Sequence, residues 1–488
     1  MSSNTEFFQK PRYSTLAVGQ EIIFSVSNAV VVLNETRVKY IVRVFIQDEE
    51  AGLSSLGTNT NVIGTFKVSP NNAGVGMIDI SNVVENYVNS DNLATNGSAV
   101  KQKNTDDDYP NPIHFIDRYS KNKNTIKYLA LRFTLEYLDE TTNLVTEDTG
   151  TWLNTDVYRI FNGYIKRTDP LVRGGVTSSG FTLPFSYFGF DLSKFNPATA
   201  AQGGPGIFLT NAPRVQYAND GDYGTLSFLT INTTTSKAIR KIIIKTFNSA
   251  GVQQSLDTIG RTSSAGSYTY NDFTPVSDRL VGYFGCFPGN LRNWSSNFKS
   301  VIEDPTKEIS YYTIETQNNS DVKTIETYTI YINCPNTKGY ESIRLCWLNQ
   351  WGAWDYYTFT QKSVRKTTTK GSTYNQLAGT WSETTYKPYG FKGGKKSFRV
   401  NATETISMNT DFVSEDENVM FEELTNSPEV YILQPYRDNT DIYSMLNDYV
   451  TPVRLKSTSF TKKTIANDKL IQYTFEVEKS ETLRTQSV

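Results

Sequence analysis

The sequence predicts a mainly β protein made of multidomain antiparallel β-sandwiches, with few short helices and long loops or arms. Three observations predict this class. Tyr and Phe account for 57 of the 488 residues, whereas His114 is the one histidine. Apolar residues recur at every second position along many segments. Clusters of Asn, Asp, Gly and Pro separate these segments, as hairpin turns require.

The composition suits a folded protein without a strong overall charge. Hydrophobic residues make up 38% and charged residues 20%, and the formal net charge is −2. This balance provides no general field for phosphate backbones or anionic lipid. We expect no signal peptide, because residues 1–10 lack a basic and an apolar stretch. No apolar run reaches about 18 residues, so no membrane insertion is expected.

The strands are predicted from alternation with a period of two. The clearest runs are 129–137 and 471–477, where apolar and polar residues alternate as in strands with one buried face. Segments 40–46 and 241–247 are more continuously apolar and are predicted to be buried more completely. Shorter alternating runs cover 327–332 and 343–347.

Helices are predicted to be few. Ser81 is expected to cap a helix over residues 82–88. Ser414 and Glu417 form a capping-box pattern ahead of an apolar face, and Pro428 ends that segment. A third helix is predicted over residues 441–449.

The chain is long enough for about three domains. Three polar or glycine-rich stretches, 91–112, 168–205 and 363–394, resemble long connections, and the last could be an extended hairpin or arm. Long loops are uncommon unless they bind something. The expected divisions are an N-terminal arm (1–13), a β-sandwich domain (14–167), a connecting loop (168–204), a second β domain (205–360), a C-terminal β domain with an inserted arm and short helix (361–479), and a tail (480–488).

The densest aromatic cluster follows Cys346. Trp351, Trp354, Tyr356 and Tyr357 could form a flat platform on which sugar rings stack. The alternative is a strand, a turn and a second strand whose aromatic side chains fill a core. Trp347 continues the alternating face of the preceding strand, which favours the core interpretation there.

A basic cluster lies further along the chain. Lys392, Lys395, Lys396 and Arg399 surround two glycines and follow three aromatic residues, Tyr386, Tyr389 and Phe391. Such a cluster could contact nucleic acid. It could equally be an arm that meets an acidic patch on a neighbouring subunit, and we favour this subunit interpretation.

The sequence contains no recognisable catalytic constellation. Phosphate-binding loops, dinucleotide-binding glycine patterns, nucleophile elbows and zinc-binding histidine pairs are not found. We therefore predict no catalytic residues, no cofactor and no metal site. His114 is interpreted as structural, and Asp416 and Glu417 as helix-capping residues in preference to a glycosidase pair.

Two further residue sets have weaker functional interpretations. The loop carboxylates Asp106, Asp107 and Asp108 are interpreted as solvated in preference to binding Ca²⁺. The three cysteines, Cys286, Cys334 and Cys346, are interpreted as reduced thiols, with a bridge between Cys334 and Cys346 as the alternative.

Several short stretches resemble virion proteins of tailed bacteriophages. They lie at 39–46, 66–70, 76–88, 207–214, 224–229, 345–359, 418–433 and 455–476. Together they are similar to tail or neck proteins of phages of Bacteroidota, including crAss-like phages. The resemblance implies a non-enzymatic component of the virion, assembled in the host cytoplasm, that forms a homo-oligomeric ring. Its implied partners are other tail, neck or fibre proteins and the DNA that passes through the particle.

The leading hypothesis is therefore a structural subunit of a phage tail or head–tail junction: a ring, hub or fibre adaptor. The alternative is a receptor-binding module that grips a bacterial surface glycan through the Trp351–Tyr357 rings. A third hypothesis, a glycan-degrading tail enzyme, requires two carboxyl groups roughly 5–10 Å apart in a cleft.

Overall fold

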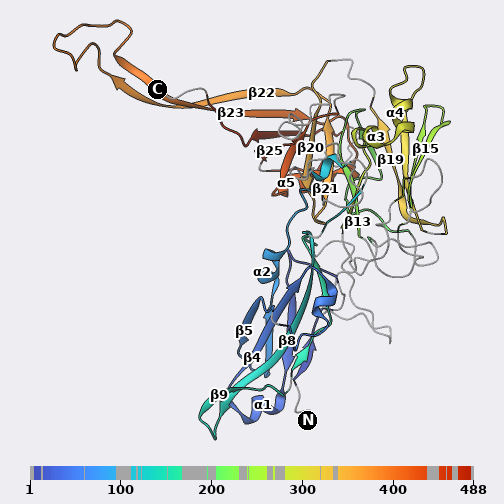
Figure 1. Ribbon diagram of the computed structural model, residues 1–488, viewed down its shortest axis with the longest axis vertical. Helices are drawn as coiled ribbons and strands as arrows, with labels where there is room; N and C mark the ends of the chain where they lie inside the picture. Colours follow the sequence, from blue (N-terminus) through green and yellow to red (C-terminus); the bar gives the residue numbers. More distant parts are fainter. Residues whose placement is uncertain are drawn as a thin grey trace. The chain divides into compact units, whose positions relative to one another are not determined.

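The computed structural model confirms the predicted mainly β, multi-sheet fold (Figure 1). Two compact units are distinguished: Met1–Gln216, Tyr223–Ile332 and Asn349–Asp355 form unit 1, and Tyr217–Asp222, Asn333–Leu348 and Tyr356–Val488 form unit 2. The structure describes residues 5–11, 15–59, 61–94, 112–116, 119–122, 124–150, 152–166, 195, 205–229, 239, 241–260, 268–269, 281–318, 320–333, 339–436, 450–457, 459–463 and 471–484.

The N-terminal part of unit 1 is a β-sandwich. A three-stranded sheet, β1-β3-β6, faces a seven-stranded sheet, β2-β11-β8-β4-β5, in which β9 and β10 also pair with β8. The strands are β1 (Glu6–Gln9), β2 (Thr15–Ala17), β3 (Ile23–Ser27), β4 (Thr36–Gln47), β5 (Gly64–Val68), β6 (Val75–Asp79), β8 (Ile126–Asp139), β9 (Leu144–Glu147), β10 (Leu153–Asn154) and β11 (Tyr158–Phe161).

The core of this sandwich comes from the alternating residues that the sequence singles out. Phe133 of β8 lies opposite Val42 of β4 and meets Phe24 and Phe7 from the facing sheet at ring distances of 6.1 and 5.5 Å. The second face of β8 is not wholly wet, because Tyr128 and Ala130 are buried in a smaller cluster. The segment 1–13, which was predicted to be an arm, includes strand β1. This strand pairs with β3 in the three-stranded sheet.

The rest of unit 1 contains two further sheets. The first has the order β12-β19-β18-β14-β15-β16, and the second has the order β13-β17-β7. In β14 one face is buried and the other only half-buried, so the prediction of more complete burial over 241–247 is wrong. The strands are β7 (Tyr119–Asn122), β12 (Val215–Ala218), β13 (Thr225–Leu229), β14 (Lys241–Phe247), β15 (Gln253–Gly260), β16 (Tyr268–Thr269), β17 (Val281–Gly285), β18 (Tyr311–Gln317) and β19 (Lys323–Ile332).

Unit 2 is built on one eight-stranded sheet. Its order is β21-β20-β24-β25-β26-β23-β22, with β27 also paired to β23. Helix α5 (Asn418–Asn426) contributes Phe421 to a cluster with Tyr357, Tyr473 and Phe475. The strands are β20 (Ile343–Leu348), β21 (Trp354–Phe359), β22 (Val364–Gln376), β23 (Gly394–Asn409), β24 (Val430–Leu433), β25 (Val450–Leu455), β26 (Thr474–Lys479) and β27 (Leu483–Arg484).

The helices are short, as predicted. The capping box is confirmed: the Ser414 backbone N–H donates to Glu417 Oε2 at 2.6 Å ahead of α5. Ser81 is not a cap but the first residue of its helix, and Asp79 Oδ1 accepts the Ser81 N–H instead. The helix predicted over 441–449 lies outside the described residues. The helices of unit 1 are α1 (Ala29–Asn34), α2 (Ser81–Val84), α3 (Pro288–Trp294) and α4 (Ser296–Ile302), and the 3-10 turns are η1 (Glu50–Leu53), η2 (Glu85–Tyr87), η3 (Ile113–Phe115) and, in unit 2, η7 (Glu415–Glu417). Among the described residues, none of these helices is long and apolar enough to cross a membrane.

Candidate functional site: an exposed basic hairpin

The most distinctive feature of unit 2 is a long hairpin formed by β22 and β23. Their register runs from Val364 opposite Ser407 at the base to Gln376 opposite Gly394 at the tip. Figure 1 shows that this pair continues well beyond the other strands of its sheet. At ~3.3 Å per residue, the 13 residues of β22 span about 40 Å. The basic stretch that the sequence singles out is therefore part of an extended hairpin.

The base of the hairpin is fixed to the sheet. Ile406 and Met408 are fully buried, and this end of β23 pairs with β26. Arg365 forms ion pairs with Glu341 at 2.5 Å and with Glu404 at 2.6 Å. Hydrogen bonds from Lys479 and Arg365 lower the pKa of Glu404, so this carboxylate remains charged at neutral pH. The hairpin thus leaves the sheet from a rigid, charged clamp.

Beyond this clamp, the hairpin is exposed on both faces. Residues 364–373 of β22 are all exposed, and so are most residues of the distal half of β23. A two-stranded ribbon without a covering layer is marginally stable in water. Because both faces of this ribbon are open to solvent, both are available for contact with another molecule.

The register divides the ribbon into a basic and a neutral face. Residues directly opposite each other in an antiparallel pair share a face. Lys370 lies opposite Asn401, Ser372 opposite Arg399, and Tyr374 opposite Lys396. The basic face consists of Lys366, Lys370, Tyr374, Lys396, Phe398 and Arg399. The neutral face consists of Thr367, Thr369, Gly371, Thr373, Ser397, Val400 and Ala402, with Lys395 at its distal end.

A β-bulge keeps the charges on one face. One extra residue of β23 is accommodated between the pairs Ser372–Arg399 and Thr373–Ser397. Phe398 and Tyr374 contact each other edge to face at 6.4 Å, which places Phe398 on the basic side. Lys396 and Arg399 therefore share a face although they are three positions apart, a spacing that would separate them in a regular strand.

The loop at the tip, residues 377–393, has a defined conformation. The Thr380 hydroxyl donates to the Thr385 carbonyl at 2.7 Å and accepts the Lys387 N–H at 2.9 Å. Gly379 has φ +77°, and a Cβ there would lie 2.4 Å from the Tyr386 ring, so glycine is required. The loop is thus ordered by its own contacts.

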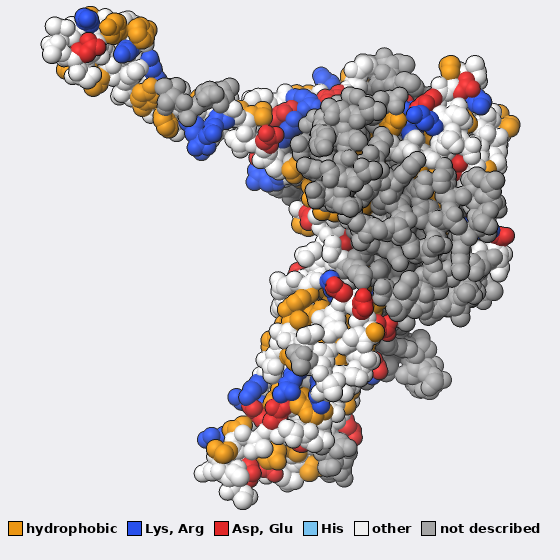
Figure 2. Space-filling model, in the orientation of Figure 1, with side chains coloured by type: hydrophobic (Ala, Val, Ile, Leu, Met, Phe, Trp, Pro, Cys, Tyr) orange, Lys and Arg blue, Asp and Glu red, His pale blue; other side chains and the backbone are white. Residues whose placement is uncertain are grey.

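This tip presents apolar side chains to solvent. Trp381 and Leu377 are each 69% exposed, Phe391 is 72% exposed and Tyr386 is 55% exposed. Trp381 packs edge to face on Tyr386 at 5.5 Å. Figure 2 shows Lys and Arg side chains next to hydrophobic ones along this hairpin. Exposed apolar groups bordered by charges are typical of interaction surfaces.

The structure places the four predicted basic residues in three different settings. Lys396 and Arg399 lie on the basic face, and Lys395 lies on the neutral face. Lys392 lies in the tip, with Nζ 5.2 Å from the centre of the Tyr389 ring. Lys396 Nζ also donates to the Phe391 carbonyl at 2.8 Å. Sequence reasoning missed Trp381, the tryptophan of the tip. It also missed the contribution of Lys366 and Lys370 to the basic face.

The predicted aromatic platform is not an exposed surface. Trp351 and Trp354 are each 2% exposed and Tyr356 is 6% exposed, so the sugar-stacking alternative at these rings is wrong. Trp354 Nε1 donates to the Asp91 carbonyl at 3.0 Å, and its ring meets His114 edge to face at 4.8 Å. Tyr357 is half-buried, and burial raises its pKa above the ordinary value. The core interpretation is confirmed for Trp351, Trp354 and Tyr356, and His114 is buried beside Trp354.

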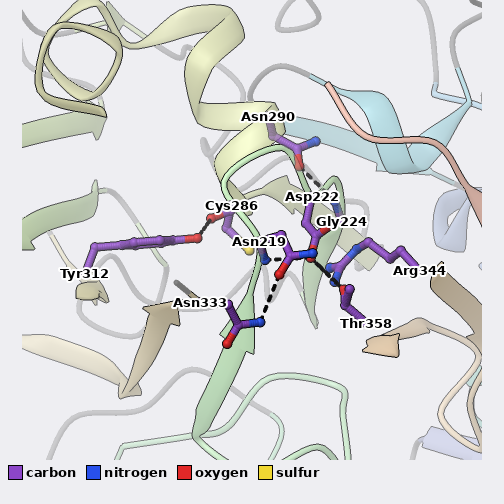
Figure 3. Close-up of polar contacts among 9 residues, drawn as sticks. All are labelled: Asn219, Asp222, Gly224, Cys286, Asn290, Tyr312, Asn333, Arg344 and Thr358. Atoms are coloured by element: carbon purple, nitrogen blue, oxygen red, sulfur yellow. Dashed lines mark hydrogen bonds and ion pairs between the residues drawn. The ribbon is translucent and has the colours of Figure 1, made fainter. Parts of the chain in front are cut away.

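Buried polar residues in both units make structural contacts (Figure 3). In unit 2, Arg344 Nη1 lies 3.2 Å from Asp222 Oδ2, and the Thr358 hydroxyl donates to the same oxygen at 2.6 Å. In unit 1, Asn290 accepts the Gly224 N–H and donates to the carbonyls of His114 and Ile116, each at 2.8 Å.

Within the described ranges, no cluster of three metal-ligating side chains occurs. Asp106, Asp107, Asp108 and Cys334 lie outside those ranges. Cys286 and Cys346 are buried, and burial raises the pKa of the Cys346 thiol. A buried thiol of this kind is poorly reactive.

Comparisons with known proteins provide little further information. No family model matches the sequence, and no curated protein matches it. Among solved structures, one similar chain is a Corynebacterium diphtheriae protein described as membrane anchored. The match has 10% sequence identity and a TM-score of 0.18, and it covers 68% of this chain and 60% of that chain. At this TM-score the match supports no inference.

Proposed function

We propose that this chain is a structural subunit of a bacteriophage tail or head–tail junction that acts by oligomeric assembly. In this proposal the β22–β23 hairpin is the arm through which one copy engages a neighbour. The phage context comes from the resemblance of the sequence stretches described above. The assembly role is supported by the shape and chemistry of the hairpin.

The observation that carries the proposal is the apolar tip, which is exposed at the end of a long ribbon. A ribbon of this length gains little stability by itself, because it covers no core. Burying Trp381 and Phe391 at an interface would remove a large apolar area from water, at ~25 cal/mol per Å². Aromatic residues at the centre of an interface commonly supply most of its binding energy.

The proposal is tested by measuring the mass of the full chain in solution. Wild-type protein is expected to form oligomers at micromolar concentration, as measured by light scattering or mass photometry. A shortened variant, in which residues 369–402 are replaced by Asn-Gly, closes the hairpin between Thr368 and Thr403 with a two-residue turn. This variant retains the clamp at the base and is expected to assemble at least tenfold more weakly.

Two results would contradict the proposal. One is a wild-type chain that stays monomeric up to tens of micromolar. The other is purified phage particles in which imaging or mass spectrometry does not find this chain.

A further inference from the structure

The charge of the hairpin differs in sign from that of the rest of the chain. Residues 366–403 contain seven basic residues and one acidic residue. The other residues therefore carry 41 basic and 49 acidic side chains, a net excess of negative charge. A basic arm on an otherwise acidic protein is electrostatically complementary to other copies of the same protein.

Unit 2 also exposes two apolar side chains in a segment that carries acidic residues. Phe412 is 56% exposed and Val419, on the first turn of α5, is 40% exposed. Asp411 and Asp416 beside them are exposed, and Glu415 is half-buried. We call this surface, residues 411–419, the acceptor surface. Its exposed apolar side chains and its carboxylates are complementary to the exposed aromatic side chains and the lysines of the hairpin tip.

The tip cannot occupy the acceptor surface of its own chain. The acceptor surface directly follows Asn409, at the base of the hairpin, whereas the tip lies at the other end of β22. The two are separated by about 40 Å of ribbon. Within unit 2, Figure 1 shows the hairpin leading away from α5. A contact between these surfaces must therefore join two copies.

We infer that the hairpin tip of one copy docks on the acceptor surface of a second copy. This inference rests on the proposed assembly function and specifies its interface. Trp381 and Phe391 meet Phe412 and Val419, while Lys387 and Lys392 approach the acidic rim. Because donor and acceptor are different surfaces, two arrangements satisfy this contact: a two-fold dimer whose copies exchange arms, and a head-to-tail series that closes into a ring or grows into a filament.

The experiment uses two charge-reversed variants of the full chain. The tip variant carries Lys387→Glu and Lys392→Glu, and the acceptor variant carries Asp411→Lys and Asp416→Lys. Each variant alone is expected to assemble at least tenfold more weakly than wild type. Mixed in equal amounts they are expected to co-assemble, because each tip then meets an acceptor of opposite charge.

Two matched controls separate this effect from nonspecific charge changes. Thr369→Glu with Thr373→Glu introduces two carboxylates on the neutral hairpin face, where assembly is expected to remain at the wild-type level. Glu140→Lys reverses an exposed charge at the end of β8 and is expected to have no effect. Circular dichroism of each variant checks that the fold is retained.

The possible outcomes distinguish the inference from the proposed function. If both reversed variants assemble like wild type, the inferred interface is wrong and the assembly function stands. If wild-type protein is monomeric, the proposed function itself is contradicted. If only the tip variant is impaired and mixing fails to rescue it, docking on the acceptor surface is wrong. Loss of duplex-DNA binding in that variant would then identify nucleic acid as the partner of the arm.

Discussion

Arg344 Nη1 lies 3.2 Å from Asp222 Oδ2, and both side chains are almost completely buried in unit 2. The Thr358 hydroxyl and the Asn219 N–H donate to the same carboxylate oxygen, at 2.6 and 2.8 Å. Burying an ion pair requires such additional hydrogen bonds, because both charges lose their hydration. The network joins β20 and β21 to the segment 217–222 within this unit.

We predict that Arg344→Met destabilises the protein by about 3–5 kcal/mol, because it leaves the Asp222 carboxylate buried without its cation. Urea unfolding measures the loss. The double variant Arg344→Met with Asp222→Leu should recover part of it, since no unpaired charge then remains. A single variant with wild-type stability would contradict the structural role of this pair.

The two tryptophans Trp354 and Trp381 should respond differently to truncation. Trp354→Ala removes a buried ring and its hydrogen bond to the Asp91 carbonyl, and we expect a loss of about 3–5 kcal/mol. Trp381→Ala removes an exposed ring, and we expect a change within about 0.5 kcal/mol. Thermal unfolding of the two variants measures this difference. Assembly should show the reverse order, with the larger effect in a folded Trp381→Ala variant.

Asp355 should contribute to the pH dependence of unit 1 stability. Burial raises the pKa of this carboxyl to about 6, and the Thr210 hydroxyl donates to it. The folded state then binds the proton more tightly than the unfolded state, whose pKa is about 4. The stabilising contribution is full below the unfolded value and is lost as pH rises through about 6.

The isosteric variant Asp355→Asn tests this dependence, because an amide cannot ionise. We expect the free energy of unfolding of wild type to fall relative to the variant between pH 4 and pH 7. Denaturant titrations at several pH values measure the difference. Parallel pH profiles for the two proteins would contradict the assignment.

Gly379 and Gly394 form a matched pair for testing the conformation of the tip. Both have positive φ, +77° and +80°, but only at Gly379 would a Cβ collide with neighbouring atoms. Gly379→Ala should displace Tyr386 and weaken assembly, whereas Gly394→Ala should add only backbone strain of about 1 kcal/mol. Near-ultraviolet circular dichroism of the tip aromatics and mass photometry compare the two. Equal effects would show that the ring contact at Gly379 is unimportant.

Local patterns in the sequence predicted much of the fold. Alternation identified β8 and β26, whose apolar residues face the cores. The capping box at Ser414 and Glu417 was also predictable, because its signal lies within four residues. Such features depend on neighbours along the chain, so one sequence is enough to find them.

Burial of individual aromatic residues could not be predicted in the same way. Trp354 and Trp381 both lie near glycines and other aromatics, yet the first is buried and the second exposed. The buried ring of Trp354 donates a hydrogen bond to Asp91, which is 263 positions away in the sequence. The partnership of Arg344 with Asp222, 122 positions apart, likewise has no local signal. The division of the hairpin into a basic and a neutral face could be recognised only from the observed register of β22 and β23.

The bulge near Phe398 links the face of the charges on β23 to the length of this strand. Phe398 is the extra residue, so a chain that lacks it regains regular alternation, with Lys396 two positions from Arg399 and still on the same face. A deletion elsewhere in β23 has no extra residue to remove, so the distal side chains of this strand would change face. Related chains can therefore lose one residue at the bulge and keep the basic face, whereas a change of length elsewhere in β23 would turn the tip toward a different neighbour.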